Sequence, residues 1–174
     1  MLRNPLKREK GFRFLVNAYK KRLYWHIRSI VLVHEDADDI LQNVFIKIFR
    51  NIEKFKGDSA LYTWMYRIAT NESLSFLKSK ANRMKKSYED LQQELIAGLS
   101  SDPYFDGDEL ELKLQEAIIS LPEKQQLVFR MKYLQDMKYE EISEVLKTSV
   151  GSLKASYHHA RKKIEAQLLK NAGT

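Results

Sequence analysis

Apolar residues recur at helical spacing along most of the chain, and this constrains the fold more than any other feature. In DADDILQNVFIKIF, residues 36–49, they stand three or four positions apart and form one stripe of a helix. The stripe contains Ile40, Leu41, Val44, Phe45, Ile48 and Phe49. The same period runs through residues 12–33, 61–77 and 110–119, whereas strand-like alternation is scarce. With only 6 glycines and 3 prolines, the sequence predicts an all-α protein.

The net charge of +7 is unevenly distributed. Residues 1–88 hold 19 Lys and Arg against 8 Asp and Glu, residues 89–116 hold 1 against 9, and residues 117–174 hold 10 against 6. Two basic blocks on either side of an acidic connector indicate two anion-binding modules. Ordinary surface charge is the alternative, because a basic patch alone is only a footprint of nucleic-acid binding.

The helical pattern decays between about residues 79 and 110, where Gly and Pro stand among acids and serines. We therefore expect two small helical domains, residues 1–80 and 110–174, joined by a flexible acidic linker over residues 81–109. That linker holds at most one weak helix near residues 88–99. The chain has no cysteine, which excludes a disulfide framework or a thiolate metal site. Its apolar runs are too short for a signal peptide or a membrane span, so we expect a cytoplasmic protein.

A helix-turn-helix is expected at about residues 139–163, within YEEISEVLKTSVGSLKASYHHARKKI. A short helix is followed by KTSVG, where Gly151 suits a tight turn, and a second helix is expected from Ser152. The inner face of that helix would hold Leu153, Tyr157, Ala160 and Ile164. Its opposite face is small, polar and basic, and it suits a recognition helix in the DNA major groove. The candidate DNA-binding residues are Ser152, Lys154, Ala155, His158, His159 and Lys162.

Two other interpretations of this motif were weighed. The pair could be an ordinary solvated helix pair in a bundle, although the turn spacing and the basic outer face favour DNA binding. His158 and His159 could ligate a metal, but helical neighbours point about 100° apart and no third ligand is evident. We expect no metal and no other cofactor.

The segment FKGDSALYTWMYRIATNESLSFLKSK, residues 55–80, combines a glycine loop with an aromatic and basic helix. Aromatic faces beside cations can hold unstacked bases, and Tyr62, Trp64 and Tyr66 alternate along the start of this helix. For Trp64 taken alone, a place in the core is the favoured interpretation. Arg67 and Asn71 lie four positions apart on one face, where polar contacts outside the core are expected.

Three motifs in this order resemble the extracytoplasmic-function (ECF) group of sigma factors in the sigma-70 family. DADDILQNVFIKIF is similar to the second-region helix, typically D-A-E-D-L-V-Q-E-x-F, and FKGDSALYTWMYRIATNES to the segment that follows it. LPEKQQLVFRMKYLQDMKYEEISEVLKTSVGSLKASYHHARKKI resembles the fourth region. The resemblance covers nearly the whole chain except the linker.

The resemblance implies a role for each motif. The polar face of the helix in residues 36–49 would dock on the clamp helices of the largest catalytic subunit of RNA polymerase. The residues at those positions are Asp36, Asp38, Asp39, Gln42 and Asn43, of which Asn43 departs from the usual Glu. Such acids would meet basic groups of the partner through charge-assisted hydrogen bonds.

The glycine loop would capture a flipped base of the promoter minus-ten element, and the recognition helix would read the minus-thirty-five element as duplex. The implied minus-ten residues are Lys56, Gly57, Asp58, Ser59, Arg67 and Asn71. In the recognition helix, Ala155 and Ser156 replace the common Ser-Arg pair and His159 replaces an Arg. An anti-sigma factor is a further partner that the resemblance implies.

The sequence therefore predicts a promoter-specificity subunit of RNA polymerase that is not itself an enzyme. A helix-turn-helix repressor or activator that binds operators without polymerase is the alternative, although no long heptad pattern provides a dimer interface. An enzyme that acts on nucleic acid by two-metal chemistry at Asp36, Asp38 and Asp39 is the weakest option, because these positions do not converge on one ion on a helix. No phosphate-binding G-x-x-x-x-G-K-[ST] motif occurs.

Overall fold

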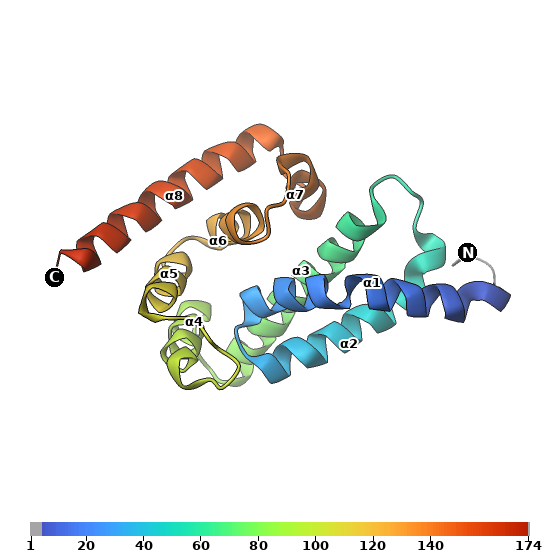
Figure 1. The fold of residues 1–174 in the computed structure, drawn as a ribbon, viewed down its shortest axis with the longest axis horizontal. Coiled ribbons are helices and arrows are strands. Elements are labelled where there is room, and N and C mark those ends of the chain that lie inside the picture. The colour runs from blue at the N-terminus through green and yellow to red at the C-terminus, as the bar shows by residue number, and fades with distance from the viewer. Residues whose placement is uncertain (1–4, 174) are drawn as a thin grey trace. The chain divides into compact units, whose positions relative to one another are not determined.

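The computed structural model describes residues 5–173, and all regular structure in that range is helical. Figure 1 shows the helices in chain order. They are α1 (Pro5–Val31), α2 (His34–Asn51), the 3-10 turn η1 (Ile52–Lys54), α3 (Leu61–Arg83), α4 (Tyr88–Ala97), the 3-10 turn η2 (Leu99–Ser101), α5 (Glu109–Ile119), α6 (Glu123–Phe129), the π-helical turn η3 (Arg130–Leu134), α7 (Tyr139–Leu146) and α8 (Val150–Ala172). The all-α prediction is confirmed.

The chain folds as two compact units, with the border between Phe76 and Leu77 inside α3. In the first unit, α1 and α2 pack along each other and α3 contributes the third side of the core. The apolar stripe of α2 is buried as predicted, except that Phe49 remains partly exposed. Phe49 lies beside the Phe12 ring, with the ring centroids 4.9 Å apart.

A buried polar contact joins α1 to α3 in this core. His26 is almost fully buried, and its Nε2 lies 2.7 Å from Thr70 Oγ1. The Thr70 hydroxyl also donates to the carbonyl of Tyr66. A buried imidazole needs such a partner, because an unsatisfied polar group in an apolar core costs about 1–3 kcal/mol.

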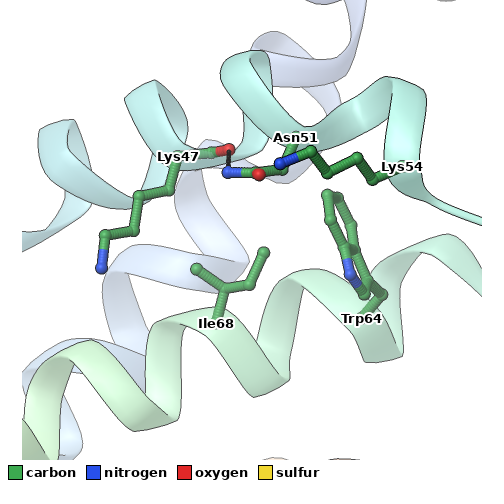
Figure 2. A pocket seen from close by; sticks show the side chains of 5 residues that line it. All are labelled: Lys47, Asn51, Lys54, Trp64 and Ile68. Carbon is green, nitrogen blue, oxygen red and sulfur yellow. Dashed lines mark hydrogen bonds between the residues drawn. The ribbon is translucent and has the colours of Figure 1, made fainter.

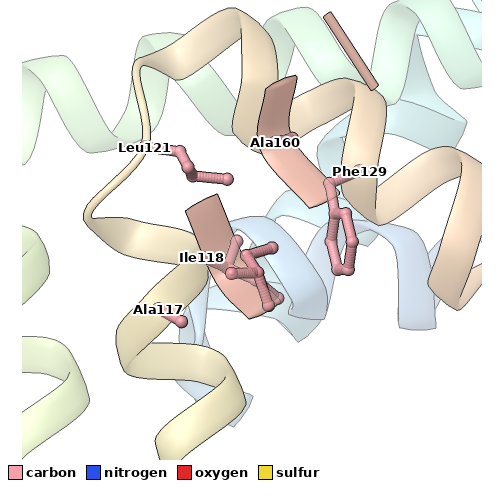
Figure 3. Close-up of a cluster of buried hydrophobic side chains, with 6 residues drawn as sticks. Ala117, Ile118, Leu121, Phe129 and Ala160 are labelled. Atoms are coloured by element: carbon pink, nitrogen blue, oxygen red, sulfur yellow. The ribbon is translucent and has the colours of Figure 1, made fainter. Parts of the chain in front are cut away.

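The second unit is built around the contacts of α8 with α5, α6 and α7. Figure 3 shows part of its core, where α5, α6 and the loop between them face α8. The cluster consists of Ala117, Ile118, Leu121, Phe129, Ala160 and Ile164. Phe129 stacks on Tyr157 of α8, with centroids 5.9 Å apart and an interplanar angle of 22°.

The segment predicted as a flexible linker, residues 81–109, contains α4, which packs on α5 in the second unit. Ser87 caps this helix by accepting a hydrogen bond from the Asp90 amide. Leu91 and Ile96 are buried, whereas the acids of α4 lie on its exposed face. This segment therefore contains apolar residues at helical spacing in spite of its acidic composition. The functional boundaries 1–80 and 110–174 stay a prediction.

Buried polar groups of the second unit are also paired. Arg130 is 3% exposed, and its guanidinium donates to Gln115 Oε1 at 3.0 Å. Burial lowers the pKa of Arg130 to about 10, so the side chain remains charged at neutral pH. Burial, assisted by the charge of Glu123, raises the pKa of Tyr88 to about 12. Tyr88 is the first residue of α4, and Arg130 directly follows α6.

Across residues 5–173, the structure contains no helix of the length and apolar character that a membrane crossing requires.

Candidate nucleic-acid and partner interfaces

The helix-turn-helix lies in α7 and α8, and its turn differs in detail from the prediction. Lys147 ends α7 in the left-handed conformation, with φ of 53°. Ser149 then caps α8 by accepting a hydrogen bond from the Ser152 amide at 3.3 Å. The helix therefore begins at Val150, and Gly151 lies inside its first turn rather than in the connecting turn. The residue that adopts the positive φ is a lysine, which the glycine-based prediction missed.

The second helix has the two faces that the sequence predicted. Leu153, Ala160 and Ile164 are buried, and Tyr157 is partly buried against Phe129. The opposite face is open to solvent and carries Lys154, Ala155, His158, His159 and Lys162. Ser152 is only partly exposed, because its hydroxyl accepts a hydrogen bond from Lys124 Nζ at 3.1 Å. The exposed face has no acid among its five residues.

A cavity of about 210 Å³ lies beside the glycine loop of the first unit. It is lined by Lys54, Phe55, Lys56, Asp58, Ser59, Trp64 and Arg67. Four of the six predicted minus-ten residues are therefore gathered around one hollow, here called the loop cavity. Gly57 lies in the same loop with φ of 78°, a conformation that favours glycine. Asn71 is exposed one turn beyond Arg67 and does not line the cavity.

The aromatic residues of α3 divide between the core and this cavity. Tyr66 is buried, so its ring is not available to a base, and the same burial raises the pKa of its phenol. Arg22 covers Tyr62, with the guanidinium carbon 5.4 Å from the ring centroid. Trp64 is only partly buried and lies 5.3 Å from Phe55 between ring centroids. The sequence favoured a core position for Trp64, but this residue forms both core and cavity wall.

The polar face of α2 is exposed over most of its length. Asp38, Asp39, Gln42 and Asn43 are exposed, whereas Asp36 is partly buried. Asp38 is held by His34, whose Nε2 lies 3.3 Å from a carboxylate oxygen of Asp38. Ile46 is 47% exposed and follows Gln42 by one turn on the same face. The sequence reasoning overlooked Ile46, although its place outside the apolar stripe was the available signal.

Family comparisons match both units of the chain. Residues 15–83 match "Sigma-70 region 2", and residues 111–164 match "Sigma-70, region 4". The ECF RNA polymerase sigma-E factor of Haemophilus influenzae is 31% identical over 170 residues, which cover 92% of this chain and 88% of that protein. The ECF RNA polymerase sigma factor SigW of Bacillus subtilis is 30% identical over 185 residues, covering 97% of each chain.

The chain belongs to the ECF sigma factors of the sigma-70 family. As such, this sigma factor binds core RNA polymerase and directs promoter-specific transcription initiation. The prediction drawn from the three motifs is confirmed, and the operator-binding regulator is not favoured.

Two solved structures share the fold of this sigma factor. The sigma factor RpoE from Bartonella quintana, crystallised with the anti-sigma factor NepR, gives a TM-score of 0.69 at 18% identity, covering 92% of this chain and 98% of that one. CnrH, in complex with the cytosolic domain of CnrY, gives a TM-score of 0.67 at 21% identity, covering 95% and 91%.

Proposed function

We propose that this sigma factor uses three separate surfaces for three tasks: the polar face of α2 for core polymerase, the loop cavity for the minus-ten element, and the outer face of α8 for the minus-thirty-five element. The observation that carries this division is the separation of charge. The α2 face is acidic, whereas the α8 face and the loop cavity are predominantly basic. The acidic α2 face suits a protein surface with basic groups, whereas the basic α8 face and loop cavity suit the phosphate backbone of DNA.

The docking surface consists of Asp36, Asp38, Asp39, Gln42 and Asn43, with Ile46 at its end. The exposed carboxylates would form charge-assisted hydrogen bonds with basic groups of the polymerase. Ile46 adds an exposed apolar side chain in line with Gln42, and an apolar anchor supplies affinity when a partner covers it. His34 would restrict the rotamers of Asp38, since its Nε2 lies 3.3 Å from a carboxylate oxygen of Asp38.

The loop cavity would hold one unstacked base of the minus-ten strand. Flipping a base costs a few kcal/mol. Stacking against an aromatic side chain contributes about 1–3 kcal/mol per base, which offsets most of that cost. Trp64 and Phe55 offer the aromatic surface, and Lys56 and Arg67 offer cations for the adjacent phosphates. Asp58 and Ser59 provide the acceptors and the hydroxyl donor that could read a base edge. Asn71 would contact the same strand outside the cavity.

The outer face of α8 would lie in the major groove of the minus-thirty-five element. Lys154 and Lys162 would reach phosphates, whereas Ala155 and His159 stand where base edges are contacted. Ser152 and His158 complete the surface. The apolar methyl of Ala155 suits a thymine methyl group.

Further properties follow from this role. An anti-sigma factor is a candidate regulator, since both solved structures that share this fold were determined with such a partner or a cytosolic protein domain. The protein would act in the cytoplasm, where its polymerase and DNA lie. It would contribute binding and promoter opening rather than a catalytic group of its own.

Site-specific photocrosslinking in the open promoter complex tests the division. With the crosslinking amino acid at position 39, we expect adducts with the largest polymerase subunit; at position 67, adducts with the minus-ten strand; at position 159, adducts with the minus-thirty-five duplex. Position 89 on α4 serves as an exposed control. Adducts of position 67 with the minus-thirty-five duplex, or of position 39 with DNA alone, would contradict the assignment.

A further inference from the structure

Trp64 separates the loop cavity from a second hollow in the first unit. The second hollow measures about 280 Å³ and is lined by Lys47, Asn51, Lys54, Trp64 and Ile68. Lys54 and Trp64 line both hollows, so the two hollows adjoin at these residues. None of the six residues that the family resemblance implied for minus-ten binding lines the second hollow.

Figure 2 shows how the walls of this hollow are arranged. Trp64 and Ile68 point from α3 toward the side chains above them, and Lys47, Asn51 and Lys54 come from α2 and η1. Asn51 donates a hydrogen bond from Nδ2 to the carbonyl of Lys47 at 2.8 Å, which fixes the amide on the wall. Lys47 forms an ion pair with Glu72 of α3, so its ammonium is held at one end of the hollow.

The chemistry of these walls matches a nucleotide. A flat indole and an aliphatic side chain offer an apolar surface to a base, and Asn51 keeps its carbonyl oxygen as an acceptor for base amino groups. Lys54 supplies positive charge for phosphates, whereas Lys47 is already paired with Glu72, and the five lining residues include no carboxylate. A cavity of about 150 Å³ already admits a benzene-sized ring, so each hollow has room for one base.

We infer that the second hollow binds another unstacked base of the minus-ten strand, with Trp64 between the two bases. This inference rests on the proposed binding of a minus-ten base in the loop cavity. Lys54 stands at the junction of both hollows, where the backbone of one strand would connect the two bases. The promoter would then be read at two single-stranded positions by two sets of residues that share only Lys54 and Trp64.

An abasic scan of a forked promoter with reconstituted holoenzyme tests this. Each nucleotide of the single-stranded minus-ten strand is replaced in turn by an abasic one, and the Kd is measured. For the wild type we expect two positions at which loss of the base weakens binding by about tenfold. Asn51→Leu should abolish the sensitivity at one of these positions only, and Arg67→Ala should abolish it at the other only.

Two further variants serve as a control and as a substitute in the abasic scan. Arg50→Ala changes an exposed cation of α2 that lines neither hollow, and it should retain both sensitive positions. If Asn51→Leu fails to fold, Asn51→Asp can replace it, because it preserves the size of the side chain. Asn51→Asp should then abolish the sensitivity to base loss at that same position.

Three results discriminate further. One sensitive position in the wild type, with Asn51→Leu unchanged on every template, would overturn the second base site and leave the loop cavity intact. Loss of core affinity with Asn51→Leu, without any dependence on the template, would assign the hollow to a polymerase side chain and also overturn the inference. No sensitive position in the wild type would contradict the proposed minus-ten function itself.

Discussion

The side-chain amides of Gln92 and Gln126 hydrogen-bond to each other inside the second unit. Gln92 Nε2 donates to Gln126 Oε1 at 3.0 Å, and the reverse bond measures 3.3 Å. Gln126 also donates to the carbonyl of Leu121 at 2.8 Å. Both glutamines are buried. The pair therefore ties α4, from the segment predicted as a linker, to α6 of the fourth region.

Gln92→Leu should destabilise the second unit. The substitution leaves the buried amide of Gln126 without one of its partners, which costs about 1–3 kcal/mol. Denaturant unfolding of the full chain measures this, with Gln93→Leu as the control because Gln93 is the exposed neighbour on α4. Equal stability of the two variants would mean that the Gln92–Gln126 pair contributes nothing to the stability of this unit.

The stability of the second unit should fall at alkaline pH through Tyr88. Its folded pKa is raised from 10.0 to about 12, so the stabilising effect of the neutral phenol is complete below pH 10 and is lost as the pH rises toward 12. Tyr88→Phe should flatten the dependence of unfolding free energy on pH in this window. Tyr104→Phe removes the phenol hydroxyl of an exposed tyrosine and should leave the slope as in the wild type.

Asp39→Arg should weaken binding to core polymerase while the fold stays intact. Asp39 is exposed on the polar face of α2, and loss of one partner of an interfacial charge pair typically costs about 2–5 kcal/mol. Competition with a labelled sigma factor for core measures the change. Glu89→Arg makes the same change of charge on α4 and should bind core normally; equal weakening by both variants would point to net charge rather than to a docking site.

Arg67→Ala should impair opening of the minus-ten element more than Asn71→Ala, because only Arg67 lines the loop cavity. Trp64→Ala should both lower stability and impair opening, since its ring is part core and part cavity wall. Because Trp64 is only partly buried, its loss should cost less than the roughly 3–5 kcal/mol of a fully buried aromatic side chain. Permanganate reactivity of promoter thymines reports opening. Normal reactivity with Arg67→Ala would remove the cavity from the mechanism.

The two kinds of DNA contact proposed for α8 should differ in their dependence on salt and on promoter sequence. Lys162→Ala should weaken binding to all promoters alike and reduce the salt slope by about one. His159→Ala should change the preferred minus-thirty-five bases by about 1–3 kcal/mol per altered pair and leave minus-ten preference unchanged. Selection from a randomised promoter library measures both. A shift confined to the minus-ten bases would contradict the division of labour.

Local pattern was sufficient to predict most helices, because the apolar period reports directly which side of a helix is buried. Leu153, Ala160 and Ile164 are buried as their spacing predicted. The sequence was less informative where many charged residues suggest a solvated segment but the apolar residues between them are buried. The acids of α4 suggested a solvated connector, yet Leu91 and Ile96 pack into the second unit.

The site residues were likewise predictable where they are close in sequence, and not where only packing brings them together. Lys56, Asp58 and Ser59 are close in sequence, so their gathering around one cavity was predictable from the motif. Lys47 and Asn51 come from another helix, and only the packing of α2 against α3 brings them to Trp64. The conformation of Lys147 was equally hidden, because a lysine carries no signal for a positive φ.

Run-off transcription with purified core polymerase tests the central claim most directly. A promoter chosen by selection with the holoenzyme is transcribed by core alone, by core with this protein, and by core with Asp39→Arg. We expect a discrete transcript only when the wild-type protein is present, and a much weaker one with the variant at the same concentration. Binding of the isolated protein to the same DNA, without any transcript from core, would contradict the assignment of this chain as a sigma factor.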